Sequence, residues 1–104
     1  MAQVLRLAAR RGVPVTVLGA GSNALVSDRG VRGIVLVLGG SLADVVPDGP
    51  GHVIAGAGLK LVVLLARAER QEWAGLAPFA GIPGTIGGAV RMNAGANLGE
   101  TKDV

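Results

Sequence analysis

The spacing of apolar and polar residues changes several times along this chain, and three segments have the spacing of helices. Residues 2–11 gather their apolar side chains on one face, and Gly12 is a natural place for that helix to end. Residues 59–71 are apolar over most of their length and predict a buried helix. A third, short helix is predicted over 85–92, with Pro83 near its start.

Shorter apolar runs rich in β-branched residues predict strands between these helices. Residues 15–18 and 33–38 each predict a buried strand, and 52–55 predicts a third one after the turn-forming residues 47–51. Residues 102–104 predict the start of a further strand. Because helices and strands alternate without an internal repeat or a linker, we predict a domain of the α/β or α+β class.

Glycine is the residue type whose share departs most from the usual composition. The chain has 18 glycines in 104 residues, against a usual share of about 7%. They lie at turns between apolar runs, so they belong to the geometry of the fold. Aromatic residues are scarce: Trp73 and Phe79 are expected to cap the core beside the 59–71 helix. A pocket that recognises bases by aromatic stacking is therefore not expected.

The charged residues do not indicate a nucleic-acid partner. The formal charge is +3, with ten lysines and arginines, and Arg6, Arg10 and Arg11 are expected on a solvated face of the first helix. No recognisable nucleic-acid-binding motif accompanies them. His52 is expected on the surface, and we find no metal site and no catalytic carboxylate pair.

The lack of cysteine and of a long apolar run narrows the class of protein further. Without cysteine there is no disulfide framework, no thiolate metal site and no cysteine nucleophile, which fits a cytoplasmic protein. The most apolar run, 61–66, is far shorter than the roughly 18 residues of a membrane span. We therefore expect no membrane partner, and the oligomeric state is not readable from the sequence.

The first glycine-rich segment, 18–25, follows a predicted strand. Gly19, Gly21 and Ala24 satisfy the permissive dinucleotide-binding fingerprint, but that fingerprint needs a helix and none fits before the turn at 27–30. An ordinary Rossmann turn is therefore disfavoured. Two interpretations remain: a nest of backbone N–H groups for phosphate, or a tight turn whose serine and asparagine bond to the local backbone.

The second glycine-rich segment, 81–95, places five glycines and a proline among apolar residues. Such a segment packs a core poorly, but it lets the backbone approach a flat or charged ligand closely. A helix that opens near Pro83 would point unpaired N–H groups at a phosphate, and Thr85 would add a hydroxyl group. No glycine loop ends in Gly-Lys-Ser or Gly-Lys-Thr, which excludes a Walker phosphate loop.

The two segments together resemble a known enzyme family. Residues 17–28 (Val-Leu-Gly-Ala-Gly-Ser-Asn-Ala-Leu-Val-Ser-Asp) and 81–96 (Gly-Ile-Pro-Gly-Thr-Ile-Gly-Gly-Ala-Val-Arg-Met-Asn-Ala-Gly-Ala) are similar to UDP-N-acetylenolpyruvoylglucosamine reductase, also called UDP-N-acetylmuramate dehydrogenase. The intervening 53–58 (Val-Ile-Ala-Gly-Ala-Gly), followed by an apolar helix, matches the family as well. The resemblance covers nearly the whole chain.

The resemblance implies a two-lobed FAD-binding domain of the vanillyl-alcohol oxidase and p-cresol methylhydroxylase type, with non-covalent FAD between two small lobes. Residues 1–104 would form a fragment of that domain, about 1–40 in the first lobe and about 41–104 in the second. Carried over by motif, the cofactor-binding residues are Gly19, Ala20, Gly21, Ser22, Asn23, Ile82, Pro83, Gly84, Thr85, Gly88, Asn93, Ala94 and Gly95.

The resemblance also implies a reaction. The family uses NADPH as hydride donor and, by way of FAD, reduces the enolpyruvyl double bond of a UDP-sugar to give UDP-N-acetylmuramate for peptidoglycan. In such enzymes the cofactor carries the chemistry, while the protein binds and orients the reactants. A UDP-sugar is thus the implied partner of the full-length protein, and the cytoplasm is the implied location.

The chain departs from the family at both ends and at one position. The family's first strand, and its catalytic arginine, serine and glutamate downstream of the Ala-Gly-Ala motif, have no counterpart here; Arg91 is not that arginine. We therefore expect a chain truncated at both ends, without a substrate-binding domain, without catalytic residues and without turnover of its own. Asn97 stands where the family often has a substrate-binding tyrosine.

Two other functions fit the same residues. A different FAD-dependent oxidoreductase of the same fold would share the cradle but lack a UDP-sugar domain, although the 81–95 string argues against it. A non-catalytic nucleotide-binding module, or a gene fragment, would fold but remain indifferent to FAD, NADPH and UDP-sugars.

Overall fold

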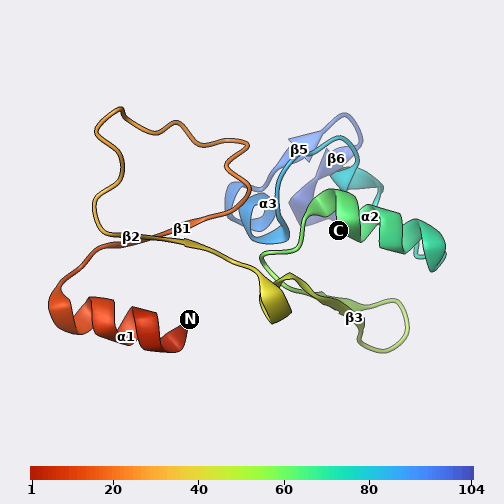
Figure 1. Ribbon diagram of the computed structural model, residues 1–104. Coiled ribbons are helices and arrows are strands. Elements are labelled where there is room, and N and C mark those ends of the chain that lie inside the picture. Colours follow the sequence, from red (N-terminus) through yellow and green to blue (C-terminus); the bar gives the residue numbers. More distant parts are fainter.

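The chain begins with a helix and two parallel strands. In the computed structural model, which describes residues 1–104, α1 (Ala2–Arg11) is followed by β1 (Val15–Leu18) and β2 (Ile34–Val37) (Figure 1). Gly12 ends α1 in the left-handed conformation, at φ 62°. The two strands pair in parallel along their whole length. The helix, its end and both strands are where the sequence predicts them.

A long connection joins the two strands. Residues 19–33 run from β1 to β2 without a helix, as a wide loop in Figure 1. This confirms that the first glycine segment does not open a Rossmann helix. The loop ends at Gly33, at φ 96°, where a Cβ would overlap the Pro14 carbonyl group. That carbonyl accepts the Ile34 N–H at 2.9 Å, so the close approach of Gly33 aligns the strands.

The two strands are not buried, contrary to the prediction. Val17 and Val37 are 59% and 69% exposed, and Ala8 is the only buried residue before Val45. A sheet of two strands has two faces to cover, and α1 is the one helix in this part of the chain. The apolar runs predict the strands correctly, but burial depends on what packs against them.

A β-hairpin follows the parallel pair. After the 3₁₀ helix η1 (Gly40–Ala43), β3 (Val45–Pro47) pairs antiparallel with β4 (Val53–Ala55). The predicted turn at 47–51 leads from β3 into the loop of this hairpin, and β4 is the predicted third strand. The sequence does not predict β3, because a three-residue strand that ends in proline has no recognisable run.

The hydrophobic core lies mainly in the second half of the chain. It is formed mainly by α2 (Leu61–Arg70), η2 (Ala77–Phe79) and α3 (Ile86–Met92), with the hairpin against it. Phe79 is buried in this core and Trp73 packs on its edge, as predicted. The buried cluster consists of Val45, Leu59, Leu61, Leu64, Phe79 and Ala89.

α2 is amphipathic rather than buried on all sides. Leu61, Leu64 and Ala68 face the core at the spacing of one helical face. Val62 and Val63 are 69% and 46% exposed. The prediction of a buried helix is therefore wrong for the outer face, because no second layer covers the aliphatic residues there.

The chain ends in a small hairpin and a 3₁₀ turn. β5 (Gly95–Ala96) and β6 (Gly99–Glu100) pair antiparallel, and η3 (Thr101–Asp103) follows directly. The predicted strand entry at 102–104 is wrong. The Asp103 carboxylate accepts the Glu100 N–H at 2.8 Å, and this capping interaction closes a helical turn instead.

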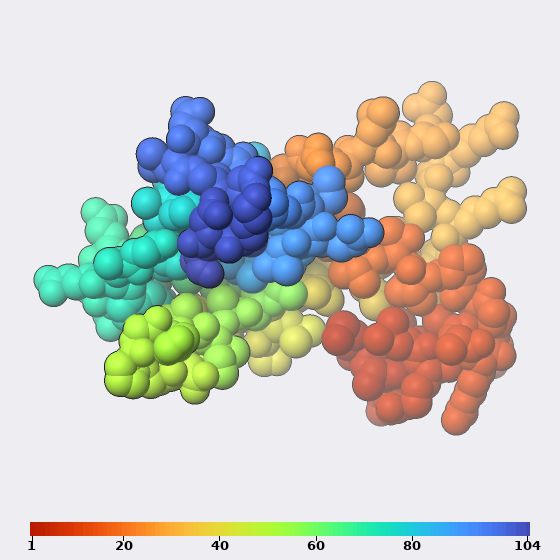
Figure 2. Space-filling model, turned by 180° about the vertical axis from the view of Figure 1, so that it is seen from behind, coloured from red at the N-terminus to blue at the C-terminus, as the bar shows by residue number.

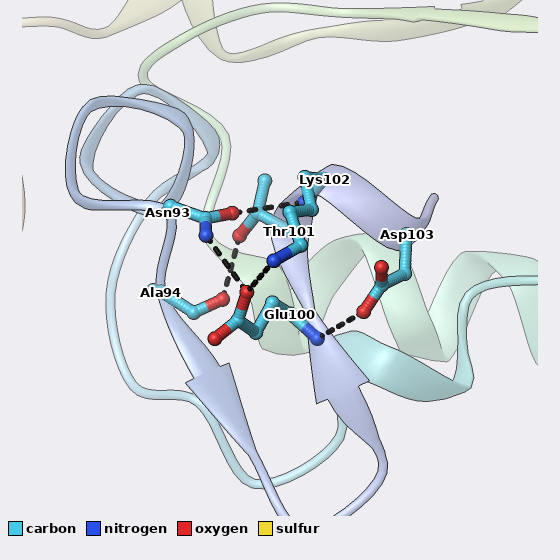
Figure 3. A network of polar contacts seen from close by, with 6 residues as sticks. All are labelled: Asn93, Ala94, Glu100, Thr101, Lys102 and Asp103. Carbon is cyan, nitrogen blue, oxygen red and sulfur yellow. Dashed lines mark hydrogen bonds and ion pairs between the residues drawn. The ribbon is translucent and has the colours of Figure 1, made fainter.

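A polar network fastens this C-terminal turn to the end of α3 (Figure 3). Asn93, the left-handed cap of α3, donates from Nδ2 to the Glu100 carboxylate at 2.9 Å and accepts the Lys102 N–H on Oδ1 at 3.0 Å. Thr101 donates its hydroxyl group to the Ala94 carbonyl oxygen at 2.8 Å. Lys102 Nζ forms an ion pair with Glu100 Oε2 at 2.6 Å. Side chains therefore hold the residues after α3 in place.

The molecule is elongated. It measures 46 × 29 × 19 Å, and its radius of gyration of 15.6 Å exceeds the about 13 Å of a compact domain of this length. Figures 1 and 2 show the reason, because α1, β1 and β2 lie to one side of the part that holds the core. None of the helices combines the length and the apolar character that a membrane crossing needs.

Replacing Gly33 with alanine should destabilise the fold, because the new Cβ would overlap the Pro14 carbonyl group at a positive φ. The positive φ alone costs about 1–3 kcal/mol in free energy of unfolding, and the overlap adds to it. Gly30→Ala is the matched control, since Gly30 has a φ of 73° and no atom within 4 Å of an added Cβ. Urea unfolding compares the two; equal losses would contradict the close approach.

The Glu100–Lys102 pair should titrate outside its ordinary range. The hydrogen bond from Lys102, then that from Asn93, lowers the pKa of Glu100, and the bond to Glu100 raises the pKa of Lys102. The pair therefore stabilises the fold fully between the ordinary values of about 4.3 and 10.4. That stabilisation is lost as pH falls through the lowered Glu100 pKa, or rises through the raised Lys102 pKa.

An NMR titration of the Glu100 side-chain carboxyl carbon measures this directly. The wild-type pKa should lie below the ordinary glutamate value, and Lys102→Met should move it back toward that value because the largest cause is removed. Both groups are exposed, so the effect on unfolding is expected to be small. A Glu100 pKa that does not respond to Lys102→Met would contradict the ion pair.

Candidate cofactor-binding cleft

A cleft of about 950 Å³ lies between the two glycine segments. The carboxyl ends of β1 and β2 open into it at Leu18 and Val37, and residues 82–95 supply much of its wall. Ligands of open α/β sheets commonly bind outside the carboxyl ends of the strands. The volume falls within the range of small-molecule and cofactor pockets, roughly 300–1,000 Å³.

Three close contacts hold the first glycine segment against the second, side by side in Figures 1 and 2. Ser22 donates its hydroxyl group to the Pro83 carbonyl oxygen at 3.1 Å. A Cβ added to Gly19 would lie 2.7 Å from the Thr85 hydroxyl oxygen, and one added to Gly84 would lie 3.2 Å from the Ser22 hydroxyl oxygen. Glycine is required at Gly19 because the two segments touch there.

The backbone N–H groups of residues 19–23 have no acceptor within the protein. The next residue, Ala24, donates its N–H to the Gly21 carbonyl oxygen at 3.2 Å. Successive unpaired N–H groups in such a turn form a nest for phosphate oxygens. A tight turn is present at 21–24, but its side chains do not bond to the local backbone: Ser22 donates to Pro83 of the second segment, and the asparagine makes no side-chain hydrogen bond.

α3 (Ile86–Met92) begins where the sequence predicts it, but the N–H groups of its first turn are not free as expected. Its N-cap is Thr85, which is buried, and its hydroxyl oxygen accepts the Gly88 N–H at 3.4 Å. The N–H groups of Ile86 and Gly87 donate to carbonyl oxygens of residues 57–59, at 2.9 and 2.8 Å. The N–H groups of residues 86–88 therefore all have acceptors within the chain and are not available to a phosphate. Instead, these bonds fix the second glycine segment to the residues before α2.

All thirteen residues predicted to bind the cofactor line this one cleft. They are Gly19, Ala20, Gly21, Ser22 and Asn23 from the first segment, and Ile82, Pro83, Gly84, Thr85, Gly88, Asn93, Ala94 and Gly95 from the second. The fold thus brings together two stretches that lie far apart in the sequence. That these residues contact a cofactor stays a prediction.

The predicted cofactor-binding residues do not include several other residues of the cleft. Ala57, Gly58 and Lys60 come from the segment before α2, and Arg91 and Met92 come from the last turn of α3. The Gly-Ala-Gly string at 56–58 is a signal for the first group, because it is a further glycine-rich stretch directly before a helix. A single lysine or arginine gives no such signal.

His52 and Phe79 lie outside the cleft. His52 is exposed in the hairpin loop, as expected, with Nδ1 2.9 Å from the Pro50 carbonyl oxygen. Phe79 is part of the buried core. Neither side chain takes part in the site.

The cleft is positively charged. Lys60 and Arg91 are the only ionisable side chains that line it, and neither forms an ion pair within the chain. Two positive charges and a nest of N–H groups suit the negative charges of a dinucleotide pyrophosphate. The close backbone approach at Gly19 suits it too, so the residues present fit a cofactor such as FAD.

The part of the cleft wall formed by residues 93–95 is held in place by the C-terminal polar network. Asn93 and Ala94 line the cleft and are bonded to Glu100 and Thr101. Glu100 does not line the cleft, and its bonds to Lys102 and Asn93 keep its pKa low, so that its charge is retained. The network therefore positions this wall without placing a carboxylate in the site.

The chain is similar to one family of enzymes along its length. The UDP-N-acetylenolpyruvoylglucosamine reductase of Phenylobacterium zucineum is 53% identical over 92 residues, 88% of this chain and 31% of that protein. The reductase of the same name from Anaeromyxobacter sp. (strain Fw109-5) is 46% identical over 104 residues, 100% of this chain and 32% of that protein. The chain therefore spans about a third of the length of these curated relatives.

A solved structure has the same fold. The crystal structure of UDP-N-acetylenolpyruvylglucosamine reductase (MurB) from Thermus caldophilus matches with a TM-score of 0.72 at 38% identity, over 95% of this chain and 36% of that one. The predicted resemblance and the predicted fold class are both confirmed. Residues 1–104 also match the family described as FAD binding domain, and the chain therefore belongs to the FAD binding domain family.

Proposed function

We propose that this chain is the flavin-binding part of a UDP-N-acetylenolpyruvoylglucosamine reductase. The main support for the proposal is the contact between the two glycine segments, because it brings all the motif residues into the wall of one cleft. A cleft that is merely structural has no need of consecutive unpaired N–H groups beside two unpaired cations. The resemblance to the reductases supplies the rest of the proposal.

The residues of the cleft would hold FAD non-covalently from both sides. The N–H groups of 19–23 would bind the pyrophosphate, and Pro83, Gly84 and Thr85 would approach it from the second segment. Asn93 to Gly95 would lie along the far end of the cleft. FAD, when bound, supplies the hydride-carrying chemistry; the chain binds and orients it.

The substrates of the whole protein follow from the same proposal. NADPH would be the hydride donor, and the enolpyruvyl ether of UDP-N-acetylglucosamine would be reduced to UDP-N-acetylmuramate for peptidoglycan. We also propose the cytoplasm as the compartment, because NADPH and nucleotide sugars are made and used there. The division into a first lobe, about 1–40, and a second, about 41–104, is part of this proposal.

Binding of FAD to the 104-residue chain is the first test. Titration of FAD, followed by flavin fluorescence, should saturate at one equivalent, and the flavin should be released on denaturation because no covalent bond is formed. Saturating FAD should raise the thermal midpoint by mass action. A folded chain that is indifferent to FAD would favour a non-catalytic module instead.

Gly19→Ala should weaken this binding, because the new Cβ would lie 2.7 Å from the Thr85 hydroxyl oxygen and push the segments apart. We expect at least a tenfold rise in Kd, or about 1.4 kcal/mol. Gly39→Ala is the matched control, because Gly39 is extended, lies outside the cleft and has no atom within 4 Å of an added Cβ. Equal Kd values for the two variants would contradict the role of the contact.

The reaction is tested in a chimera. This chain would replace the segment it matches in the Anaeromyxobacter reductase, to which it is 46% identical over 104 residues. The chimera should oxidise NADPH only when the enolpyruvyl UDP-sugar is present, whereas the chain alone should show no turnover. A chimera that binds FAD but oxidises NADPH with no dependence on the UDP-sugar would favour a different flavin oxidoreductase.

A further inference from the structure

Lys60 lines the same cleft as the loop 19–23 without belonging to either glycine segment. Its backbone forms an isolated antiparallel bridge with Thr85. Backbone hydrogen bonds of 3.0 and 2.9 Å flank this bridge and hold the two residues opposite each other. The position of Lys60 is therefore fixed relative to the second glycine segment.

This pairing sets the direction of the lysine side chain. Residues directly opposite each other in an antiparallel pair project their side chains from the same face. The Thr85 hydroxyl oxygen lies against Gly19, 2.7 Å from where a Cβ would stand. Lys60 consequently leaves the backbone on the face that meets the first glycine segment, and it lines the same cleft as that segment.

Lys60 is exposed, and its ammonium group has no partner in the chain. The chain's one ion pair joins Lys102 and Glu100, and no hydrogen bond involves Lys60 Nζ. Arg91, the other cation of the cleft, lies on α3 six residues beyond Thr85, about 9 Å further along the helix axis. Lys60 is thus the cation tied to the residues that contact the N–H nest.

We propose that the Lys60 ammonium group binds the pyrophosphate of the dinucleotide cofactor, opposite the N–H groups of residues 19–23. This rests on the proposed function and names a ligand residue that neither glycine motif contains. Backbone N–H groups donate hydrogen bonds but carry no net charge, so a nest alone leaves the two negative charges uncompensated. A lysine acts as a compact point charge and needs no fixed orientation to bind phosphate.

The test compares three substitutions by FAD titration at two salt concentrations. Lys60→Met should raise the Kd for FAD about tenfold at low ionic strength, and its Kd should depend less on salt than that of wild type, because an ionic contact is lost. Lys60→Arg should restore most of the affinity, since it keeps the charge. Arg70→Met removes a positive charge from the opposite end of α2, outside the cleft, and should leave the Kd unchanged.

Each other result would count against the assignment. An unchanged Kd and salt dependence for Lys60→Met, in a chain that binds FAD, would overturn the role of Lys60 but leave the proposed function standing. Equal losses for Lys60→Met and Arg70→Met would show a general effect of net charge, and would overturn it as well. Failure of the wild-type chain to bind FAD would overturn the proposed function itself. Thermal unfolding without FAD checks that the variants fold alike.

Discussion

The approach of Gly19 to Thr85 is the constraint on which the cleft depends. Thr85 is 7% exposed and carries two duties, because its hydroxyl oxygen caps α3 through the Gly88 N–H and also forms the surface against which Gly19 stands. Any side chain at Gly19 would disturb both. One hydroxyl group therefore takes part both in the contact between the two glycine segments and in the start of α3, and this explains why glycine stands at position 19.

The residues that stabilise the fold and the backbone groups that would bind a ligand come from different parts of the chain. The buried cluster, which includes Leu61, Leu64 and Phe79, lies in the second half of the sequence except for Val45, while the nest at 19–23 comes from a loop with no buried side chains. Backbone groups that are to bind a ligand must be left without partners in the protein, so they cannot also hold a sheet together. The core and the polar network at Asn93 supply the rigidity that the loop lacks.

The sequence predicts this architecture well where local chemistry decides, and poorly where packing decides. Gly12 and the apolar runs at 15–18, 33–38 and 52–55 act within a few residues, so the helices and three strands are predicted. Burial of Val17 and Val62 is predicted wrongly because it depends on a covering layer. Lys60 is missed because its place in the cleft arises only from its pairing with Thr85, a partner distant in the sequence.

The low burial of residues 1–44 has a consequence for the local stability of this part of the chain. Ala8 is the only buried residue before Val45, so the unit formed by α1, β1 and β2 has little buried apolar area to stabilise it against local unfolding. Its backbone amides should exchange with solvent faster than those of α2, whose inner face is buried. A ligand that bridges the two glycine segments would slow that exchange, so folding of the first part and occupancy of the cleft are one coupled equilibrium.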